Sequence, residues 1–166
     1  ISDQFSRIRF DLVLNTLVMR AIMHEKISVF GGQQFRPLLH VRDVASVIAN
    51  NLDSNHSGIY NLHSENITIV AIADRIKSFF PNLNVEITGT SFQDNRNYKV
   101  SSCKAERDLS FIPVYKIDDG IIELKQLLEN GRMKNSFLAR FSNYLHLKPL
   151  LKEYTSPLGK VIKMNF

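Results

Sequence analysis

The 166-residue sequence contains one cysteine, no tryptophan and only seven glycines. The single cysteine, Cys103, cannot form an internal disulfide, and a protein without disulfides fits a reducing cytoplasm. Its stability must therefore come from a hydrophobic core. No window approaches the roughly 18 consecutive apolar residues of a membrane-spanning helix, and no signal-peptide pattern opens the sequence. We therefore expect a cytoplasmic protein with no membrane partner.

Several common site motifs are also missing from the sequence. It has neither the GxGxxG pattern of dinucleotide-binding turns nor the GxxxxGK[ST] pattern of P-loops. It lacks the GxSxG elbow of the α/β-hydrolases. The five histidines and one cysteine never fall at the spacing of zinc ligands. The sequence therefore predicts no catalytic residue and no metal site.

The excess of positive charge is confined to one end of the chain. The formal net charge is +5, and residues 132–166 contain seven Lys or Arg against one Glu, whereas residues 1–131 are nearly neutral. Such a tail can contact nucleic acid or acidic lipid, but it is more often a solvated or subunit-facing helix. We predict a basic, partly helical tail over residues 132–166, helical near 136–147 and broken by Pro149, and we do not expect nucleic-acid binding.

Strands and helices alternate along residues 1–131, which predicts the α/β class. Apolar residues at helical spacing and period-two alternation define the two kinds of element. The predicted helices cover residues 11–26, 43–52, 68–80, 102–109 and 118–130, and the predicted strands cover 27–30, 36–41, 58–62 and 85–88.

Polar residues and glycines mark the ends of these elements. Asp11 and Asp43 are expected to cap the first two helices, and Asn66 or Thr68 the third. The Gly31-Gly32 pair predicts a tight turn after the first strand. Gly131 is expected to end the last of these helices.

Four sequence blocks occur in a specific order between residues 9 and 130. The first is ISVFGGQQFRPLLHVRDVA (27–45), with an Arg-x-x-x-His-Val-x-Asp-Val-Ala spacing. The second is GIYNLHSENITI (58–69), the third is DNRNYKVSSCKAERDLSF (94–111), and the fourth is Pro113 followed by IDDGI. In this order they resemble the NAD-dependent epimerase/dehydratase family, the extended short-chain dehydrogenases/reductases that act on nucleotide sugars. The sequence departs from the family pattern at Ser110, where glycine is usual.

This resemblance implies the C-terminal, substrate-binding portion of an extended Rossmann-type, doubly wound enzyme, followed by a helical tail. In the family, NAD lies mainly on the N-terminal half, where it takes a hydride from the sugar transiently and a Tyr, a Lys and a Ser/Thr handle the proton and hydride transfer. We expect the chain to lack that half and to be inactive alone. The implied partners are a nucleoside diphosphate-sugar and either the N-terminal half or further copies of the chain.

The resemblance also implies the substrate-binding residues. Arginines at the positions of Arg36 and Arg96 clamp the diphosphate in the family, and a guanidinium suits this because it binds phosphate oxygens in a bidentate manner. Val29 and Phe30 correspond to a segment that lines the nucleotide base. Asn15 can direct its amide toward the ligand.

Other interpretations of these residues remain open. The two arginines could pair with carboxylates such as Asp94 and not with phosphate. His40 is expected to be a hydrogen-bonded core histidine, and Cys103 a small packed side chain. Tyr144 and Lys148 have the Tyr-x-x-x-Lys spacing of short-chain dehydrogenases, but they lie in the tail without a glycine-rich turn, so we assign them no catalytic role.

Two further functions are compatible with the sequence. The chain could be a non-catalytic nucleotide-sugar-binding module, which would bind nucleoside diphosphates without needing a dinucleotide. It could also be an interaction protein whose basic tail binds an acidic partner, which would make binding steeply dependent on salt.

Overall fold

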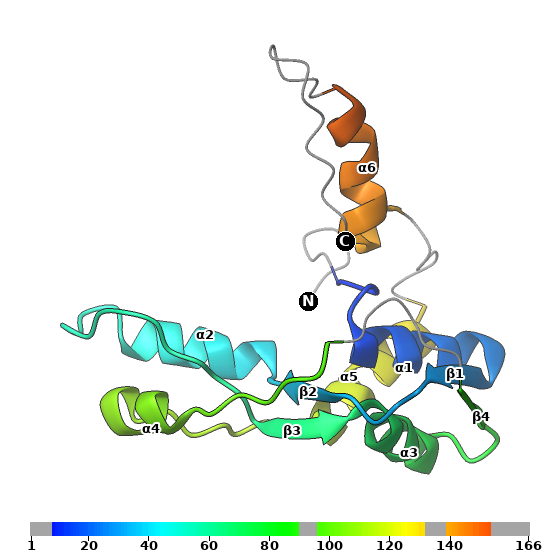
Figure 1. The fold of residues 1–166 in the computed structure, drawn as a ribbon, viewed down its shortest axis with the longest axis horizontal. Coiled ribbons are helices and arrows are strands. Elements are labelled where there is room, and N and C mark those ends of the chain that lie inside the picture. The colour runs from blue at the N-terminus through cyan, green and yellow to red at the C-terminus, as the bar shows by residue number, and fades with distance from the viewer. Residues whose placement is uncertain (1–7, 90–95, 132–138, 154–166) are drawn as a thin grey trace.

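Short strands and helices alternate along the chain (Figure 1). The computed structural model describes residues 8–89, 96–131 and 139–153. This order of elements confirms the predicted α/β class. Within the described residues, no helix combines the length and apolar character that crossing a membrane requires.

The strands form two separate two-stranded sheets. β1 (Lys26–Phe30) pairs in parallel with β4 (Asn84–Thr88). β2 (Phe35–Leu38) pairs in antiparallel fashion with β3 (Glu65–Thr68). Parallel strands need a crossover connection, and here the chain between β1 and β4 includes two helices and the second sheet.

Helices cover these sheets and supply most of the core. Their bounds are α1 (Val13–His24), α2 (Val41–Asn50), α3 (Ile69–Phe79), α4 (Cys103–Leu109), α5 (Ile117–Glu129), the short 3-10 helix η1 (Ala139–Phe141) and α6 (Asn143–Glu153). The predicted helices near 11–26, 43–52, 68–80, 102–109 and 118–130 are therefore confirmed, with ends shifted by a few residues.

A hydrophobic core lies between α1, α3, α5 and strand β1. Apolar side chains at helical spacing point inward from each helix, and the strand contributes its alternate residues. The most deeply buried members are Val18, Ile27, Val29, Ile72, Ile76 and Ile121. This core fixes the orientation of α1 and α5, and these two helices form walls of the cavity described below.

The glycine pair after β1 forms the predicted turn between β1 and β2. Gly31 has φ 68° and Gly32 has φ 86°, both in the left-handed region that favours glycine. At Gly32 a Cβ atom would also lie 2.9 Å from Val29 Cγ1. The turn therefore depends on glycine for both backbone conformation and space.

The cap predictions are confirmed for one helix and wrong for two. Thr68 caps α3, because its hydroxyl accepts a hydrogen bond from the Ala71 N–H at 3.3 Å. Leu12, not Asp11, occupies the cap position of α1. The Asp11 carboxylate instead accepts from the Asn143 N–H at 2.8 Å, so a contact distant in sequence takes the place of the local cap.

Asp43 does not cap α2. His40 occupies the cap position, and its Nδ1 accepts from the Arg42 N–H. Asp43 lies in the first turn, is buried, and accepts from the N–H groups of Val114 (3.1 Å) and Tyr115 (3.2 Å). Its carboxylate therefore ties α2 to the loop before α5.

The predicted strand at residues 58–62 is wrong, because these residues are in no helix or strand. Period-two alternation describes side-chain directions, but a strand also needs a neighbour for its backbone hydrogen bonds. Among the described residues, no strand pairs with this segment.

Two predictions in the last part of the sequence are also corrected. Pro149 does not break the tail helix, because α6 runs through it to Glu153. Cys103 is exposed and not packed. The start of the tail is anchored by Phe141, which is buried beside Phe10 and Met19, and α6 projects away from the rest of the molecule (Figure 1).

Candidate functional site

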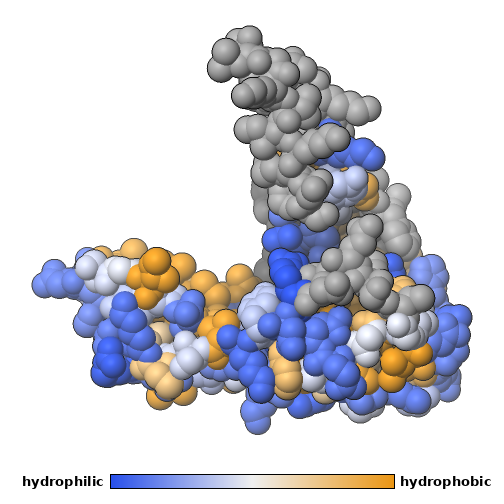
Figure 2. Space-filling model, in the orientation of Figure 1, coloured by the Kyte–Doolittle hydropathy of each residue, from blue (hydrophilic) through white to orange (hydrophobic). Residues whose placement is uncertain are grey.

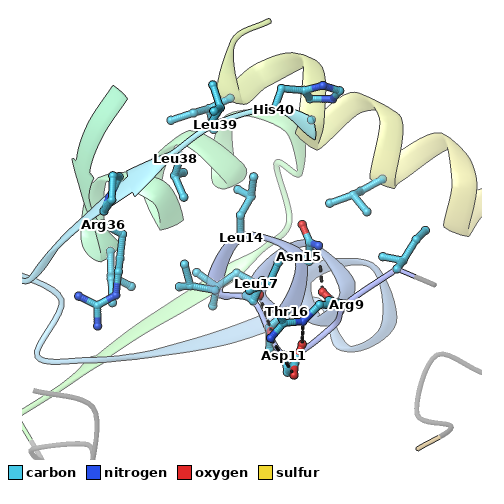
Figure 3. A pocket seen from close by; sticks show the side chains of 18 of the residues that line it. Arg9, Asp11, Leu14, Asn15, Thr16, Leu17, Arg36, Leu38, Leu39 and His40 are labelled. Carbon is cyan, nitrogen blue, oxygen red and sulfur yellow. Dashed lines mark hydrogen bonds and ion pairs between the residues drawn. The ribbon is translucent and has the colours of Figure 1, made fainter. Parts of the chain in front are cut away.

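A cavity of about 1120 Å³ opens between α1, the ends of β1 and β2, and α5 (Figure 3). All five residues that the sequence pointed to line this one cavity: Asn15, Val29, Phe30, Arg36 and Arg96. They come from four separate segments, and only the tertiary fold brings them together.

The two candidate phosphate-binding arginines are in direct contact through the backbone. Arg36 lies on β2 and is only 9% exposed, and its Nη1 donates to the carbonyls of Phe35 and Arg96. Its guanidinium also lies 5.6 Å from the ring centroid of Tyr98. Arg36 thus holds the segment that carries Arg96 against β2, while the Arg96 side chain is exposed. Asp94, the proposed carboxylate partner, lies outside the described residues.

A second bond supports the same contact. The Asn97 side-chain oxygen accepts from the Phe35 N–H at 2.9 Å. Residues 96 and 97 are therefore attached to β2 by both backbone and side-chain groups, and Arg96 is held at the cavity edge.

The other three predicted residues lie on the walls that β1 and α1 form. Val29 is buried in the core beneath the cavity, and Phe30 is half-buried at the end of β1. Asn15 faces the cavity from α1 (Figure 3), with its Nδ2 donating to the Arg9 carbonyl at 2.9 Å. The same side chain therefore also holds the segment that precedes α1.

The charge of the lining favours an anion. Among the described residues that line the cavity, five are basic and two are acidic: Arg9, Arg20, Arg36, Arg96 and Lys116 against Asp11 and Glu123. Both carboxylates already have cationic partners, since Asp11 pairs with Arg9 at 3.0 Å and Glu123 pairs with Arg42 at 2.9 Å. The described part of the lining therefore has a net positive charge.

The far wall contains a polar group that sequence reasoning did not assign to the site. His40 lies at the opposite end of β2 from Arg36 (Figure 3), and its Nε2 is 3.4 Å from a Glu123 carboxylate oxygen. The ring stacks on Tyr115, with centroids 4.7 Å apart. His40 is hydrogen-bonded, as expected, but it lines the cavity and is not a core residue. Its spacing of four residues from Arg36 is the signal that could have placed it on the same side of the strand.

The described residues do not fit the pyrophosphate of a dinucleotide. Such a site places a glycine-rich turn between a strand and the N-terminus of a helix. The Gly31-Gly32 turn instead joins two strands, β1 and β2. In the described part of the chain, no three His, Cys, Asp or Glu side chains gather as metal ligands would.

Comparison with solved structures gives consistent matches to one kind of fold. The chain superposes on ADP-L-glycero-D-manno-heptose-6-epimerase from Helicobacter pylori with a TM-score of 0.61 and 20% identity, covering 70% of this chain and 37% of that one. It superposes on dTDP-glucose 4,6-dehydratase from Bacillus anthracis, solved with NAD, with a TM-score of 0.61 and 22% identity, covering 74% and 40%.

The chain has the fold of the C-terminal part of an NAD-dependent epimerase or dehydratase. It spans about 40% of the length of the dehydratase that it matches. The epimerase/dehydratase fold is not limited to sugar enzymes, because L-threonine dehydrogenase from Phytophthora infestans also matches, with a TM-score of 0.61 and 13% identity, covering 69% and 40%. No family model and no curated protein matches the sequence.

Proposed function

We propose that this chain is the nucleotide-sugar-binding part of an NAD(P)-dependent sugar epimerase or dehydratase. In the full-length protein, the bound nicotinamide would accept a hydride from the sugar and later return it. Within this chain, Arg36 and Arg96 would contact the diphosphate, Val29 and Phe30 the base, and Asn15 a polar group of the ligand.

The positive lining of a single large cavity carries this proposal. A diphosphate has about two negative charges, and charge-assisted hydrogen bonds from guanidinium groups are the strong ones. Arg96 combines an exposed side chain with a backbone held by Arg36 and Asn97. It can therefore bind phosphate with little cost in ordering the segment that carries it. The volume also suits a ligand of nucleotide-sugar size.

We further propose that this chain alone does not catalyse the reaction. Among the described residues that line the cavity, no tyrosine and lysine have the Tyr-x-x-x-Lys spacing, and Tyr144 and Lys148 lie on α6, outside that lining. The division into a substrate-binding part (1–131) and a basic tail (132–166) is also proposed, as is a cytoplasmic location. The projection of α6 in Figure 1 supports the division.

Calorimetric titration with UDP, dTDP, ADP and UDP-glucose tests the proposal. At least one diphosphate is expected to bind, and Arg96→Gln is expected to weaken that binding by about 10- to 100-fold, the loss of one charge-assisted contact. Arg107→Gln is the matched control, because Arg107 is exposed and pairs with Asp108 outside the cavity. No binding by the unaltered chain, or equal losses in both variants, would reject the proposal.

A turnover assay and a salt series separate the other two functions. A non-catalytic module would bind the diphosphate identically but would give no turnover when combined with the cofactor-binding half and NAD. A basic-tail interaction protein would show no diphosphate preference, and its binding would fall steeply with salt and disappear when residues 132–166 are removed.

A further inference from the structure

One wall of the cavity is a segment without regular secondary structure. We define the entry segment as residues 8–12, which precede α1 and belong to no helix or strand. Phe10, at its centre, is buried beside Phe141 and does not line the cavity. The other four residues of the segment do line it: Ile8, Arg9, Asp11 and Leu12. Because the segment belongs to no helix or sheet, its position depends on the contacts of individual groups.

The start of the tail holds the entry segment from behind. We define the tail base as residues 139–143, which comprise η1 and the residues that lead into α6. The Phe10 N–H donates to the Phe141 carbonyl at 2.9 Å, and the two rings meet edge to face with their centroids 5.8 Å apart. The Asn143 N–H donates to the Asp11 carboxylate at 2.8 Å. The tail residues that the structure describes do not line the cavity, so the tail contacts the back of this wall and not its inner surface.

Asp11 connects the tail base to Arg9. Its Oδ1 accepts from Arg9 Nε at 3.0 Å, and its Oδ2 accepts both from Arg9 Nη2 at 3.3 Å and from the Asn143 N–H. Paired bonds of this kind fix the plane of the guanidinium, and a carboxylate at the N-terminus of a helix also interacts favourably with the helix dipole. Figure 2 shows hydrophilic surface at this junction, where the tail joins the rest of the molecule. The orientation of the Arg9 guanidinium therefore depends on where α6 begins.

Arg9 keeps one edge of its guanidinium for a ligand. The pair with Asp11 uses Nε and one hydrogen of Nη2, and among the described residues no hydrogen bond involves Nη1. The side chain lines the cavity and is 42% exposed. The remaining edge, Nη1 with the second hydrogen of Nη2, has the fork that binds a phosphate or carboxylate in a bidentate manner. Asp11 reduces the net charge at this point, but it also fixes the side chain, which lowers the entropy cost of binding.

We propose that the tail belongs to the substrate site, because the tail base positions Arg9, through Asp11, to bind an anionic group of the ligand. Arg9 is the residue that contacts the ligand, and Asp11 and Asn143 are positioning residues. In the identity of that ligand, a nucleoside diphosphate or its sugar conjugate, the inference rests on the proposed function. The coupling is reciprocal: since docking of α6 favours ligand binding, bound ligand must favour docking of α6 to the same degree.

Asn143→Pro removes this contact and keeps the helix. Proline has no N–H to donate to Asp11, yet it is favoured at the first position of a helix, and α6 begins at this residue. Calorimetric titration with the nucleoside diphosphate that binds the unaltered chain should show affinity reduced about 3- to 10-fold, the worth of one hydrogen bond. The far-UV circular dichroism of the chain should not change.

Lys148→Gln is the matched control for this titration. Lys148 is exposed on the same helix, so the change removes one charge of the tail and leaves the tail base intact. The affinity of this variant should equal that of the unaltered chain. An unchanged affinity in Asn143→Pro would overturn the proposal. Equal losses in both variants would overturn it as well, because they would assign the effect to long-range charge.

Proton exchange at Arg9 measures the positioning without any ligand. The Nε–H of Arg9 donates to Asp11, just as the Nε–H of Arg107 donates to Asp108 at 2.7 Å. Nuclear magnetic resonance should show that Asn143→Pro speeds exchange of the Arg9 Nε–H by about threefold or more and leaves that of Arg107 unchanged. Equal changes at both arginines, or none at Arg9, would contradict the link from the tail base to Arg9.

Bound ligand provides the reciprocal measurement. Saturating diphosphate should raise the hydrogen-exchange protection of the Asn143 amide by about 3- to 10-fold, the factor that Asn143→Pro loses in affinity. The Glu106 amide, which donates to the Ser102 carbonyl at 2.9 Å in α4, should not respond. Arg9→Gln should bind the ligand more weakly and abolish the response at Asn143. A response of the same size in Arg9→Gln would overturn the proposal.

These outcomes distinguish failure of the inference from failure of the proposed function. Equal diphosphate affinity in the unaltered chain, Arg9→Gln and Asn143→Pro would reject only the role of the tail. No binding of any nucleoside diphosphate would reject the nucleotide-sugar function, and inorganic pyrophosphate is then the probe. A shift of the Arg9 Nε–H resonance on adding pyrophosphate, smaller in Asn143→Pro, would support the anion-binding role of Arg9, and the absence of a shift would overturn it.

Discussion

The guanidinium of Arg36 donates to the backbone carbonyl of Arg96, sixty residues further along the chain. The resemblance assigns both residues to the same ligand group, but the structure gives them different positions. Arg36 is buried and supports the segment, whereas Arg96 presents an exposed side chain. A substitution at each position should therefore have a different effect.

Arg36→Lys should lower both stability and diphosphate affinity. The Arg36 Nη1 donates to the Phe35 and Arg96 carbonyls, and a lysine side chain, which is one atom shorter and has no rigid guanidinium plane, cannot hold its ammonium in that position, so a buried contact is lost. We expect the free energy of unfolding to fall by about 1–3 kcal/mol. Arg96→Gln should change it by less than about 0.5 kcal/mol, as is usual for exposed positions. Urea unfolding of the two variants measures the difference, and equal losses would contradict the assignment.

Ser110→Gly should stabilise the chain. Ser110 follows α4 with φ 52°, a left-handed conformation that costs a residue with a Cβ roughly 1–2 kcal/mol. Glycine removes that strain but adds entropy to the unfolded chain, so the net gain should be about 0.5–1 kcal/mol. Thermal unfolding of Ser110→Gly checks this, and Ser110→Ala, which keeps the Cβ, should give no such gain. A loss of stability in the glycine variant would show that the hydroxyl matters more than the backbone strain.

Gly120→Ala and Gly32→Ala should have opposite effects. At Gly120, inside α5, a Cβ would make ordinary contacts of 3.8 Å with His40 Cδ2 and Leu14 Cδ2. Alanine is better than glycine in a helix interior by about 1 kcal/mol, so the chain should become more stable. Gly32→Ala should destabilise it, because φ is 86° and the Cβ would meet Val29 Cγ1 at 2.9 Å. Unfolding midpoints of both variants test the pair, and a shift of the same sign in both would be contrary to expectation.

The attachment of α6 should weaken in acid. Partial burial raises the pKa of the Asp11 carboxyl, but hydrogen bonds from Arg9 and the Asn143 N–H lower it, and the net pKa lies below the ordinary value of 3.8. Because the folded pKa lies below the unfolded one, the contribution of the ionised Asp11 carboxylate to stability is complete at pH values well above 3.8. It is lost as the pH falls through the lower, folded value.

Hydrogen exchange of the Asn143 amide measures this attachment, because that N–H donates to Asp11. Its protection factor should be constant between about pH 5 and 7 and should fall below about pH 4. Asp11→Asn should remove the acid dependence and lower the protection at all pH values. A protection factor that falls equally in both proteins would assign the pH effect to another group.

The sequence alone determined the local features of this protein. Thr68 caps its helix, the Gly31-Gly32 pair turns the chain, and Gly131 follows α5 with φ 65°, all as predicted. Each of these features depends on residues within a few positions, so short-range hydrogen bonding and backbone sterics are sufficient to set them. The helices α1, α3 and α5 were predicted for the same reason, since helical spacing of apolar residues defines them.

Tertiary structure decided the features that depend on distant partners. Asp43 looked like a cap, but its carboxylate binds backbone groups 71 and 72 residues away. Residues 58–62 have the alternation of a strand, yet no strand among the described residues lies beside them. The cavity likewise exists only where α1, β1, β2 and α5 meet. A residue's own sequence neighbourhood specifies its conformation, but its hydrogen-bond partner and its burial are set by which segments fold against it.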